Sequence, residues 1–322
     1  MQTTGADGRA LRLAYRECVR TARSHYENFP VASLFLPRRL RDPVAAIYVF
    51  ARSADDFADE GEAPPATRLA QLDGLASELD AVCAGHPAQT PQFLALADTI
   101  RRFELPVQLF HDLLTAFRMD VTQRRYPDFE AVLGYCRHSA NPVGRLVLHL
   151  GGEASAENLY CSDAICSALQ LINFMQDIAQ DYDENDRIYL PLEDMAACGV
   201  KPEDLGARRG DANMRRLIAM QLERILGLLQ TGAPLALRLR GRLGLQIRLT
   251  LYGALSITAR LADPRSDLYA RPRLARRDWF WMLRKALGGR RALNHLAWPR
   301  ATPARPQSVE GNPRADDSVR VS

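Results

Sequence analysis

The chain is poor in the features that mark several large classes of protein. No run approaches the roughly 18 consecutive apolar residues that a bilayer-spanning helix needs. The N-terminal stretch MQTTGADGRALRLAYREC lacks an apolar core followed by a cleavage site, which argues against a secretory signal. Alternating β-branched runs are rare, so we expect no sheet.

Cysteine clusters and an excess of one charge are also missing. The six cysteines are scattered, with no CxxC pair and no Cys/His group at zinc-like spacing. We therefore expect buried or free thiols in a reducing cytoplasm. A net charge of only +4 argues against binding of nucleic acid. No GxGxxG follows a strand, so no NADPH site is expected.

What the chain does contain is helical periodicity. It is 47% hydrophobic, and apolar residues recur at helical spacing through about the first 290 residues. Proline and glycine fall between these segments. We predict an all-α fold, a single helical bundle of roughly ten helices over 1–298. The polar segment 299–322 is predicted to be a disordered tail.

Two of the predicted helices carry most of the chemistry. The first is expected to start with Asp42 as its cap and Pro43 in its first position, and to stop at Gly61. The second is expected to start near Ser162 or Asp163 and to run through IAQ, before a loop rich in Asn and Asp.

Each of these helices places two carboxylates one turn apart on a polar face. The first set is Tyr48, Arg52, Asp55 and Asp59, and the second is Gln170, Asn173, Asp177 and Asp181. Like charges at this spacing weaken a helix by a few tenths of a kcal/mol, and turning them inward costs more unless a cation compensates. One alternative is that the acidic faces of both helices are simply exposed to solvent and bind no metal.

Magnesium is the cation that suits these groups best. It binds carboxylate oxygens and water, and it completes its shell with substrate phosphates. Two acidic helices that face each other could hold two or more Mg²⁺ ions with a diphosphate between them, and the metals would neutralise the charge on the leaving diphosphate. Arg52 and Arg187 stand where they could assist.

At these residues the sequence resembles the squalene and phytoene synthase family. The matching elements are ARSADDFADE at 51–60, YCRHSANPVG at 135–144, NFMQDIAQD at 173–181 and RIYLP at 187–191. Their order and spacing both match, and the resemblance covers roughly residues 10–290.

The resemblance implies an isoprenoid synthase fold with a central cavity and a prenyl diphosphate substrate. It implies Asp55, Asp59, Asn173, Asp177 and Asp181 as metal ligands, with Tyr135 lining the cavity as a further catalytic residue. It also implies Arg52, Gln170, Asn173, Arg187 and Tyr189 as substrate-binding neighbours. We add Asn28, Tyr48 and Gln176 as further candidates for substrate binding. Small residues at Ala140 and Gly144 would leave room for the prenyl tail.

Departures from the commonest family pattern point to one branch. Asn28 stands in ENFPVAS where many members have Ser-Phe, and Gln176 precedes the second metal aspartate where many condensing members have Arg. These elements look like the hydroxysqualene synthase branch of bacterial hopanoid pathways, which ionises presqualene diphosphate and lets water trap the cation. Loss of an Arg at 176 fits an enzyme that holds one diphosphate instead of two.

The sequence does not single out the residue that positions this water. Its candidates are Asn28, Ser33, Asn141 and Gln176. For Asn141, which precedes Pro142, a plain turn role is favoured.

The same motifs are compatible with other functions. Within the same class, the chain could join two prenyl diphosphates as a presqualene diphosphate or phytoene synthase. In a different class, some relatives are non-catalytic assembly factors that lack the metal ligands; all four aspartates are present here. A plain cation-binding acidic protein would not need the element around Tyr135.

The segment 271–291 combines eight basic residues with Trp279, Phe280 and Trp281. It is interpreted either as a basic amphipathic helix on an anionic membrane or as a terminal helix packed on the core. We expect a cytoplasmic protein, with peripheral contact to the inner membrane face under the first interpretation. Other enzymes of the hopanoid pathway are candidate partners.

Overall fold

The structure is a computed structural model that describes residues 5–24, 37–59, 61 and 63–288. Within these ranges the chain forms fifteen helices and no strand, and one isolated parallel bridge joins Arg125 to Ile188. The predicted all-α fold is confirmed. The count exceeds the expected ten because short helices of five to eight residues occur where loops were expected. The expected tail, 299–322, lies outside the described residues.

The helices follow one another with short connections. The first half comprises α1 (Gly5–Ser24), α2 (Arg38–Asp59), α3 (Pro65–Cys83), α4 (Pro91–Phe103), α5 (Gln108–Thr122), α6 (Phe129–Ser139) and α7 (Asn141–Gly151). The second half comprises α8 (Ala156–Gln176), α9 (Ile178–Asn185), α10 (Leu192–Cys198), α11 (Pro202–Gly206), α12 (Ala212–Gly232), α13 (Pro234–Arg238), α14 (Gly241–Leu261) and α15 (Arg276–Leu287).

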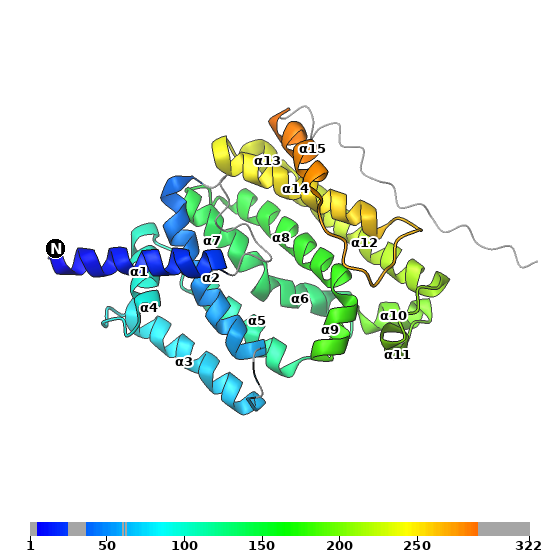
Figure 1. Cartoon of the computed structure of the whole chain (residues 1–322), viewed down its shortest axis with the longest axis horizontal. Helices are drawn as coiled ribbons and strands as arrows, with labels where there is room; N and C mark the ends of the chain where they lie inside the picture. The colour runs from blue at the N-terminus through cyan, green and yellow to red at the C-terminus, as the bar shows by residue number, and fades with distance from the viewer. Residues whose placement is uncertain (1–4, 25–36, 60, 62, 289–322) are drawn as a thin grey trace, which may run out of the picture.

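The hydrophobic core has two large parts that meet at α7. One part gathers around α2, α3, α4 and α5, and the other around α8, α12 and α14 (Figure 1). On α7, Leu146 and Leu150 belong to the first part and Leu148 to the second. Burial of each such leucine stabilises the fold by about 1.5–3 kcal/mol, so α7 ties the two halves into one bundle.

Helix α8 runs through the middle of the bundle and is held by two glycines on neighbouring helices. A Cβ at Gly144 of α7 would overlap Ser162 and Cys166, and a Cβ at Gly232 of α12 would overlap Ile165. Both helices therefore approach α8 more closely than any side chain would allow. This places the helix that carries the second acidic motif in a fixed register between α7 and α12.

The predicted start of the first acidic helix is wrong. Helix α2 begins at Arg38, not at Pro43, and Pro43 lies inside it. Leu40, in the first turn, is 1% exposed and packs in the core. Burial of this turn outweighs the poor fit of a proline inside a helix. The predicted stop agrees with the structure, because α2 ends at Asp59 and Gly61 has a φ of 79°.

The second acidic helix also differs from its prediction at both ends. It begins at Ala156, because the Ser155 side chain caps it by accepting from the Asn158 amide. It ends at Gln176, and Asp177 (φ −109°, ψ 14°) separates it from α9. The amide of Asp177 still donates to Asn173 and that of Asp181 to Asp177, so the one-turn spacing of the two carboxylates survives.

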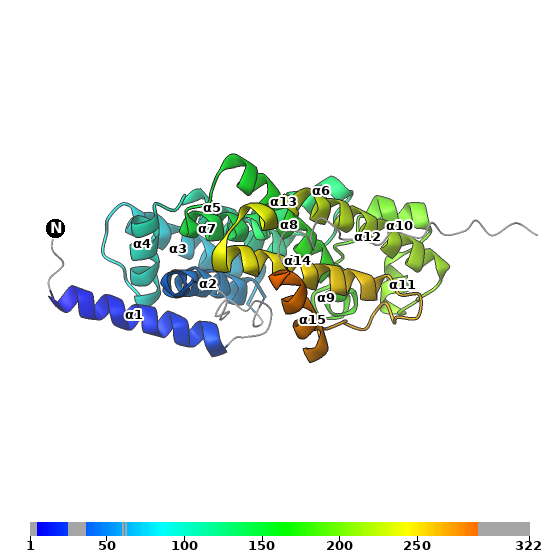
Figure 2. The same ribbon diagram turned by 90° about the horizontal axis from the view of Figure 1, so that it is seen from above.

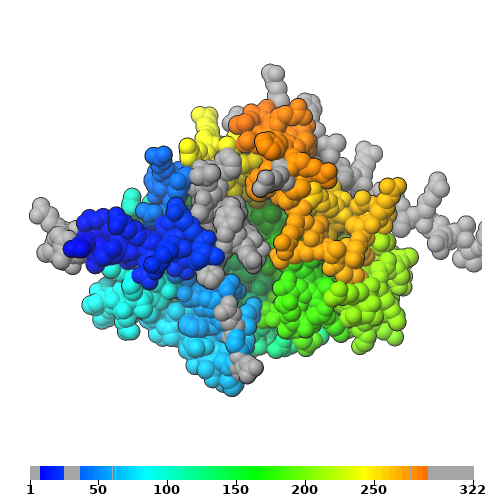
Figure 3. All heavy atoms as spheres, in the orientation of Figure 1, coloured from blue at the N-terminus to red at the C-terminus, as the bar shows by residue number. Residues whose placement is uncertain are grey.

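The molecule is elongated, with α1 on the outside of α2 and α4 at one end and α10 and α11 at the other (Figure 2). The space-filling view shows a hollow on one face with α8 at its floor and residues 262–288 along one side (Figure 3). None of the described helices combines the length and the apolar character that crossing a membrane requires.

Candidate active site

A cavity of about 360 Å³ lies between the two acidic motifs. Its wall comes from α2, α5, α6, α8 and α9, together with the non-helical segments 186–191 and 262–275. The predicted site residues that line it are Asp55, Asp59, Tyr135, Gln170, Asn173, Asp177, Asp181, Arg187 and Tyr189. The cavity is also lined by Leu113, Ala116, Phe117, Asp120, Ser139, Phe174, Asn185 and Arg271.

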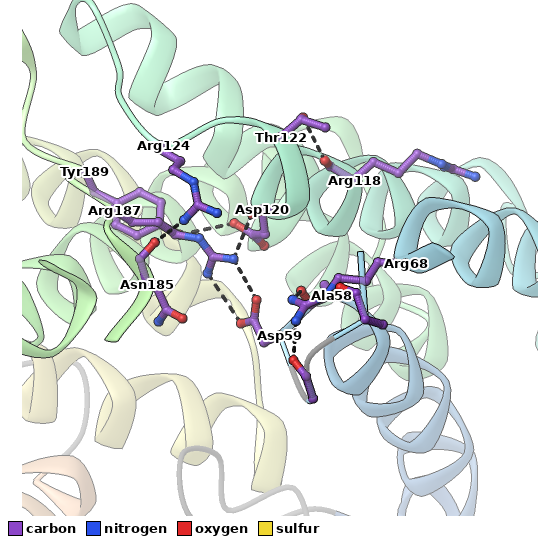
Figure 4. Close-up of polar contacts among 12 residues, drawn as sticks. Ala58, Asp59, Arg68, Arg118, Asp120, Thr122, Arg124, Asn185, Arg187 and Tyr189 are labelled. Carbon is purple, nitrogen blue, oxygen red and sulfur yellow. Dashed lines mark hydrogen bonds and ion pairs between the residues drawn. The ribbon is translucent and has the colours of Figure 1, made fainter. Parts of the chain in front are cut away.

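The first carboxylate pair sits at the C-terminal end of α2. Arg68 of α3 fixes this end by donating hydrogen bonds to the carbonyl oxygens of Ala58, Gly61 and Ala63 (Figure 4). Asp59 then forms an ion pair with Arg187, whose Nη2 lies 2.6 Å from its Oδ1. The loop that follows α9 is thereby linked directly to α2.

Arg187 lies at the centre of the site. Its side chain is 8% exposed, and besides Asp59 it donates to the backbone oxygen of Asp120 at 2.8 Å (Figure 4). Its Nε is buried without a hydrogen-bond partner among the described residues. A guanidinium held in this way presents fixed positive charge to the cavity, as binding of a phosphate group requires.

Asp120 is a buried carboxylate under this arginine. The hydroxyl of Tyr135 donates to its Oδ2 at 2.9 Å, and the hydroxyl of Tyr189 donates to its Oδ1 at 3.1 Å. Burial raises the pKa of Asp120 to about 7, while Arg187 opposes that rise and Asp59 adds to it. Asp120 therefore fixes two phenols of the cavity wall.

Those phenols belong to an aromatic wall. The Phe174 and Tyr189 rings stack with centroids 3.7 Å apart and planes 5° from parallel. The Tyr135 ring lies 5.5 Å from Tyr189 and 5.8 Å from Phe174. The faces of such rings carry partial negative charge and stabilise a nearby cation. The site thus combines a polar, charged end with an aromatic one.

The second carboxylate pair faces the cavity from the α8–α9 junction. Asp177 Oδ1 lies 2.7 Å from the Nε of Arg271. Burial raises the pKa of Asp177, against the effect of Arg271 and Arg273. Burial also raises the pKa of Asp181 to about 7, and the neighbouring Asp177 carboxylate adds to this rise.

The carboxylates of Asp177 and Asp181 suit divalent cations that are also coordinated by the phosphate groups of a substrate. The Asp181 side chain has no hydrogen bond or ion pair with the described residues, and burial disfavours its charge. A divalent cation would relieve both effects. In the part of the chain that the structure describes, no three Asp, Glu, His or Cys side chains converge on one point. A metal would therefore take few ligands from the protein and the rest from water and substrate.

Three predicted substrate-binding residues do not line the cavity. Tyr48 packs against the core beneath α1, and Arg52 forms ion pairs with Asp55 and Asp56 at 3.1 and 2.6 Å. Gln176 donates to the carbonyl oxygen of Pro272 at 2.6 Å and so holds the 262–275 segment.

Gln176 lies beside a cation that the sequence did not place there. Arg271 brings a guanidinium to Asp177 from the segment that Gln176 holds. A positive charge beside the second carboxylate pair is therefore supplied from another part of the chain. The link between Gln176 and a single bound diphosphate stays a prediction.

The expectations for Gly144 and Asn141 are also wrong, and two other candidate residues lie outside the described part of the chain. Gly144 faces α8 instead of the cavity, because its missing side chain makes room for Ser162. Asn141 is 6% exposed, is the first residue of α7 and accepts a hydrogen bond from Ser167, so it is a buried polar contact and not a plain turn. Asn28 and Ser33 lie outside the described residues.

Sequence reasoning missed Asp120, Ser139 and Arg271. Asp120 is a lone acid on an otherwise apolar helix face, which is a usable but weak signal. Ser139 lies one turn after Tyr135, and this spacing alone could have placed it on the same face. Arg271 was assigned to the basic segment 271–291, and no local pattern links it to Asp177.

The comparisons with known proteins agree with this architecture. The family model for squalene/phytoene synthase matches residues 22–279. A hydroxysqualene synthase of Rhodopseudomonas palustris is 40% identical over 71% of this chain and 77% of its own length. A phytoene synthase of Mycobacterium tuberculosis is 34% identical over 60% of this chain and 63% of its own.

Among solved structures, squalene synthase HpnC from Alicyclobacillus acidocaldarius is 41% identical, covers 78% of this chain and 94% of its own, and superposes with a TM-score of 0.73. The fold is thus the helical isoprenoid synthase fold with its central cavity. The chain belongs to the squalene/phytoene synthase family and is an enzyme that processes isoprenoid diphosphates.

Proposed function

We propose that this enzyme is a hydroxysqualene synthase, which ionises presqualene diphosphate, adds water to the resulting cation and releases diphosphate. The observation that carries the proposal is the make-up of the cavity. Two carboxylate pairs and two arginines line one part of it, and aromatic and aliphatic side chains line the rest. The 40% identity to a hydroxysqualene synthase favours this branch over condensing members.

We infer that Mg²⁺ ions bind at the charged end. The residues that would hold them are Asp55, Asp59, Asn173, Asp177 and Asp181. When bound, Mg²⁺ acts as a Lewis acid that stabilises the negative charge of the departing diphosphate. The chain's own arginines, Arg187 and Arg271, add positive charge at the same end, and Gln170 supplies an amide for hydrogen bonding.

The other end of the cavity serves the hydrocarbon. Leu113, Ala116 and Phe117 of α5 offer apolar surface, which suits a prenyl chain. The stacked rings of Phe174 and Tyr189 face the cavity and stabilise positive charge on carbon. Because Asp120 accepts from both Tyr135 and Tyr189, these phenols are held in place and their oxygens are kept from attacking the cation. The overall reaction needs water and no reductant.

The runner-up is a condensing enzyme that joins two prenyl diphosphates, because phytoene synthases are also related at 34% identity. A product assay separates the two. Purified enzyme with Mg²⁺ is given presqualene diphosphate or farnesyl diphosphate, and products are read by mass spectrometry. Conversion of farnesyl diphosphate to presqualene diphosphate, with presqualene diphosphate left untouched, would sink the proposal. Turnover of neither would favour the non-catalytic alternative.

Two variants test the metal assignment in the same assay. Asp55→Asn and Asp177→Asn each remove one charged ligand and should lower turnover severely while circular dichroism shows the helical fold intact. Asp73→Asn is the matched control, because Asp73 is an exposed carboxylate that pairs with Arg118 on the surface. Near-normal turnover in both cavity variants would show that the metal site is misassigned.

We also propose that the outer face of α15 rests on an anionic membrane. Met282 and Ala286 bury the inner face of α15, while Phe280 and Leu287 are 78% and 66% exposed. Arg277 and Arg284 flank these apolar side chains on the exposed face. A small apolar ridge ringed by cations suits the interface of an anionic bilayer, and Arg271, which lines the cavity, lies only five residues before α15.

Vesicle flotation tests this contact. The enzyme should float with phosphatidylcholine vesicles that contain phosphatidylglycerol at about 0.1 M salt, and less at about 1 M salt. Phe280→Ser should weaken flotation, whereas Tyr160→Ser, which alters another highly exposed aromatic (67%) on α8, should not. Two results would contradict the proposal. One is equal flotation with and without phosphatidylglycerol, and the other is equal flotation of Phe280→Ser and Tyr160→Ser.

A further inference from the structure

Ser139 has an unusual environment in the cavity wall. It is the last residue of α6 and lines the cavity. Its Oγ is shielded from bulk solvent and has no hydrogen-bond partner among the described residues. Buried hydroxyls nearly always have a partner, so the partner of this one is expected to be a molecule inside the cavity.

The level of Ser139 in the cavity follows from how α5 and α6 pair. Tyr135 contacts Asp120, whereas His138, three residues later, approaches Asp112 at 3.8 Å. The two helices are therefore antiparallel. Ser139 lies one turn, or about 6 Å, beyond Tyr135, away from the carboxylates and toward the level of Leu113.

Four other polar groups considered for this water are already engaged or lie elsewhere, whereas Gln170 of α8 also lines the cavity and is distinguished from Ser139 by the experiment below. The hydroxyls of Tyr135 and Tyr189 donate to Asp120. Asn141 accepts from Ser167, and Gln176 donates to the backbone of Pro272. Ser139 thus places a hydroxyl with hydrogen-bonding capacity beside the aliphatic part of the wall.

We propose that Ser139 holds the water molecule that captures the prenyl cation, which is an inference that rests on the proposed hydroxysqualene synthase activity. The carbon–oxygen bond to diphosphate breaks, and both electrons leave with the diphosphate. The oxygen of the bound water then donates a lone pair to the cationic carbon, and a new carbon–oxygen bond forms. The extra proton passes from the water to the released diphosphate, and the product is a neutral alcohol. Ser139 only orients the water and is unchanged.

The expected consequence is a change in product identity. Without an oriented water, the cation loses a proton to give hydrocarbon products instead. In Ser139→Ala, the ratio of alcohol to hydrocarbon should fall about tenfold, which is the effect of one hydrogen bond of typical strength. Ser139→Thr keeps the hydroxyl and should restore the ratio. Ser77→Ala, an exposed serine on α3, is the control and should leave it unchanged.

The experiment incubates each full-length variant with presqualene diphosphate and Mg²⁺, and it measures alcohol and hydrocarbon per diphosphate released. This ratio does not depend on the overall rate. An unchanged ratio in Ser139→Ala, or a lowered ratio in Ser139→Thr that matches alanine, overturns the proposal. A shift in Gln170→Leu without one in Ser139→Ala assigns the water to Gln170 of α8 and also overturns it. If the wild type makes no alcohol at all, the proposed function itself has failed.

Discussion

Replacement of Asp120 by alanine should destabilise the enzyme, because the buried hydroxyls of Tyr135 and Tyr189 would lose their hydrogen-bond acceptor. The carboxylate is 6% exposed and accepts from Tyr135 at 2.9 Å and from Tyr189 at 3.1 Å. An unsatisfied buried donor costs about 1–3 kcal/mol. Two of them would cost about 2–6 kcal/mol, and relief of the desolvated carboxylate offsets part of this. We expect a net loss of about 2–4 kcal/mol, a large share of the 5–15 kcal/mol that is typical of a folded protein.

A double-mutant cycle identifies the cause. Tyr135→Phe removes one of the stranded hydroxyls, so it should cost about 1 kcal/mol or more in the wild type but almost nothing beside Asp120→Ala. Urea unfolding followed by circular dichroism supplies the free energies, provided that the slope with urea concentration is the same in all four proteins. A loss below about 1 kcal/mol for Asp120→Ala, or strict additivity in the cycle, would refute the reasoning.

Three further outcomes are expected. The pKa of Asp120 is raised from 3.8 to about 7, so its contribution to stability is full below about pH 4 and is lost as the pH rises through about 7. Unfolding free energies of the wild type should therefore fall across this range by on the order of a few kcal/mol more than those of Asp120→Asn; parallel pH profiles would contradict this. Gly144→Ala should lower the melting temperature, at a cost of about 1–3 kcal/mol from overpacking against α8, whereas Gly134→Ala, which meets open space, should not. Mg²⁺ with inorganic diphosphate should raise the melting temperature of the wild type and raise it much less in Asp177→Asn; equal shifts would argue against a metal at the second pair.

The periodicity of the sequence was enough to predict the helical class and the faces of the acidic motifs. Asp55, Asp59, Asp177 and Asp181 line one cavity because a one-turn spacing survives even where α8 gives way to α9. Helix starts were less predictable. Pro43 and Asp42 offered good local signals for a helix start, yet α2 begins earlier because Leu40 is buried by contacts with distant parts of the chain.

Long-range contacts also explain the site residues that were missed. Arg271 reaches Asp177 across more than ninety positions of sequence, and Asp120 becomes important only because Tyr135, Tyr189 and Arg187 surround it. Gly144 was misassigned for the same reason, since a small residue in a motif can serve either a ligand or a neighbouring helix. Only the three-dimensional arrangement shows which of the two it serves.

The two glycine contacts on α8 have a consequence for experiments that survey many mutations at once. A side chain at Gly144 or Gly232 would overlap α8 and destabilise the fold, although neither residue lines the cavity. In a screen scored by product formation, both positions would look as intolerant as the aspartates that we propose to bind metal. A parallel measurement of protein abundance in the cell would separate them: substitutions at the glycines should deplete the protein, whereas Asp→Asn changes in the cavity should leave it abundant and inactive. Without that second measurement, residues that fix the register of α8 would be mistaken for residues that bind substrate or metal.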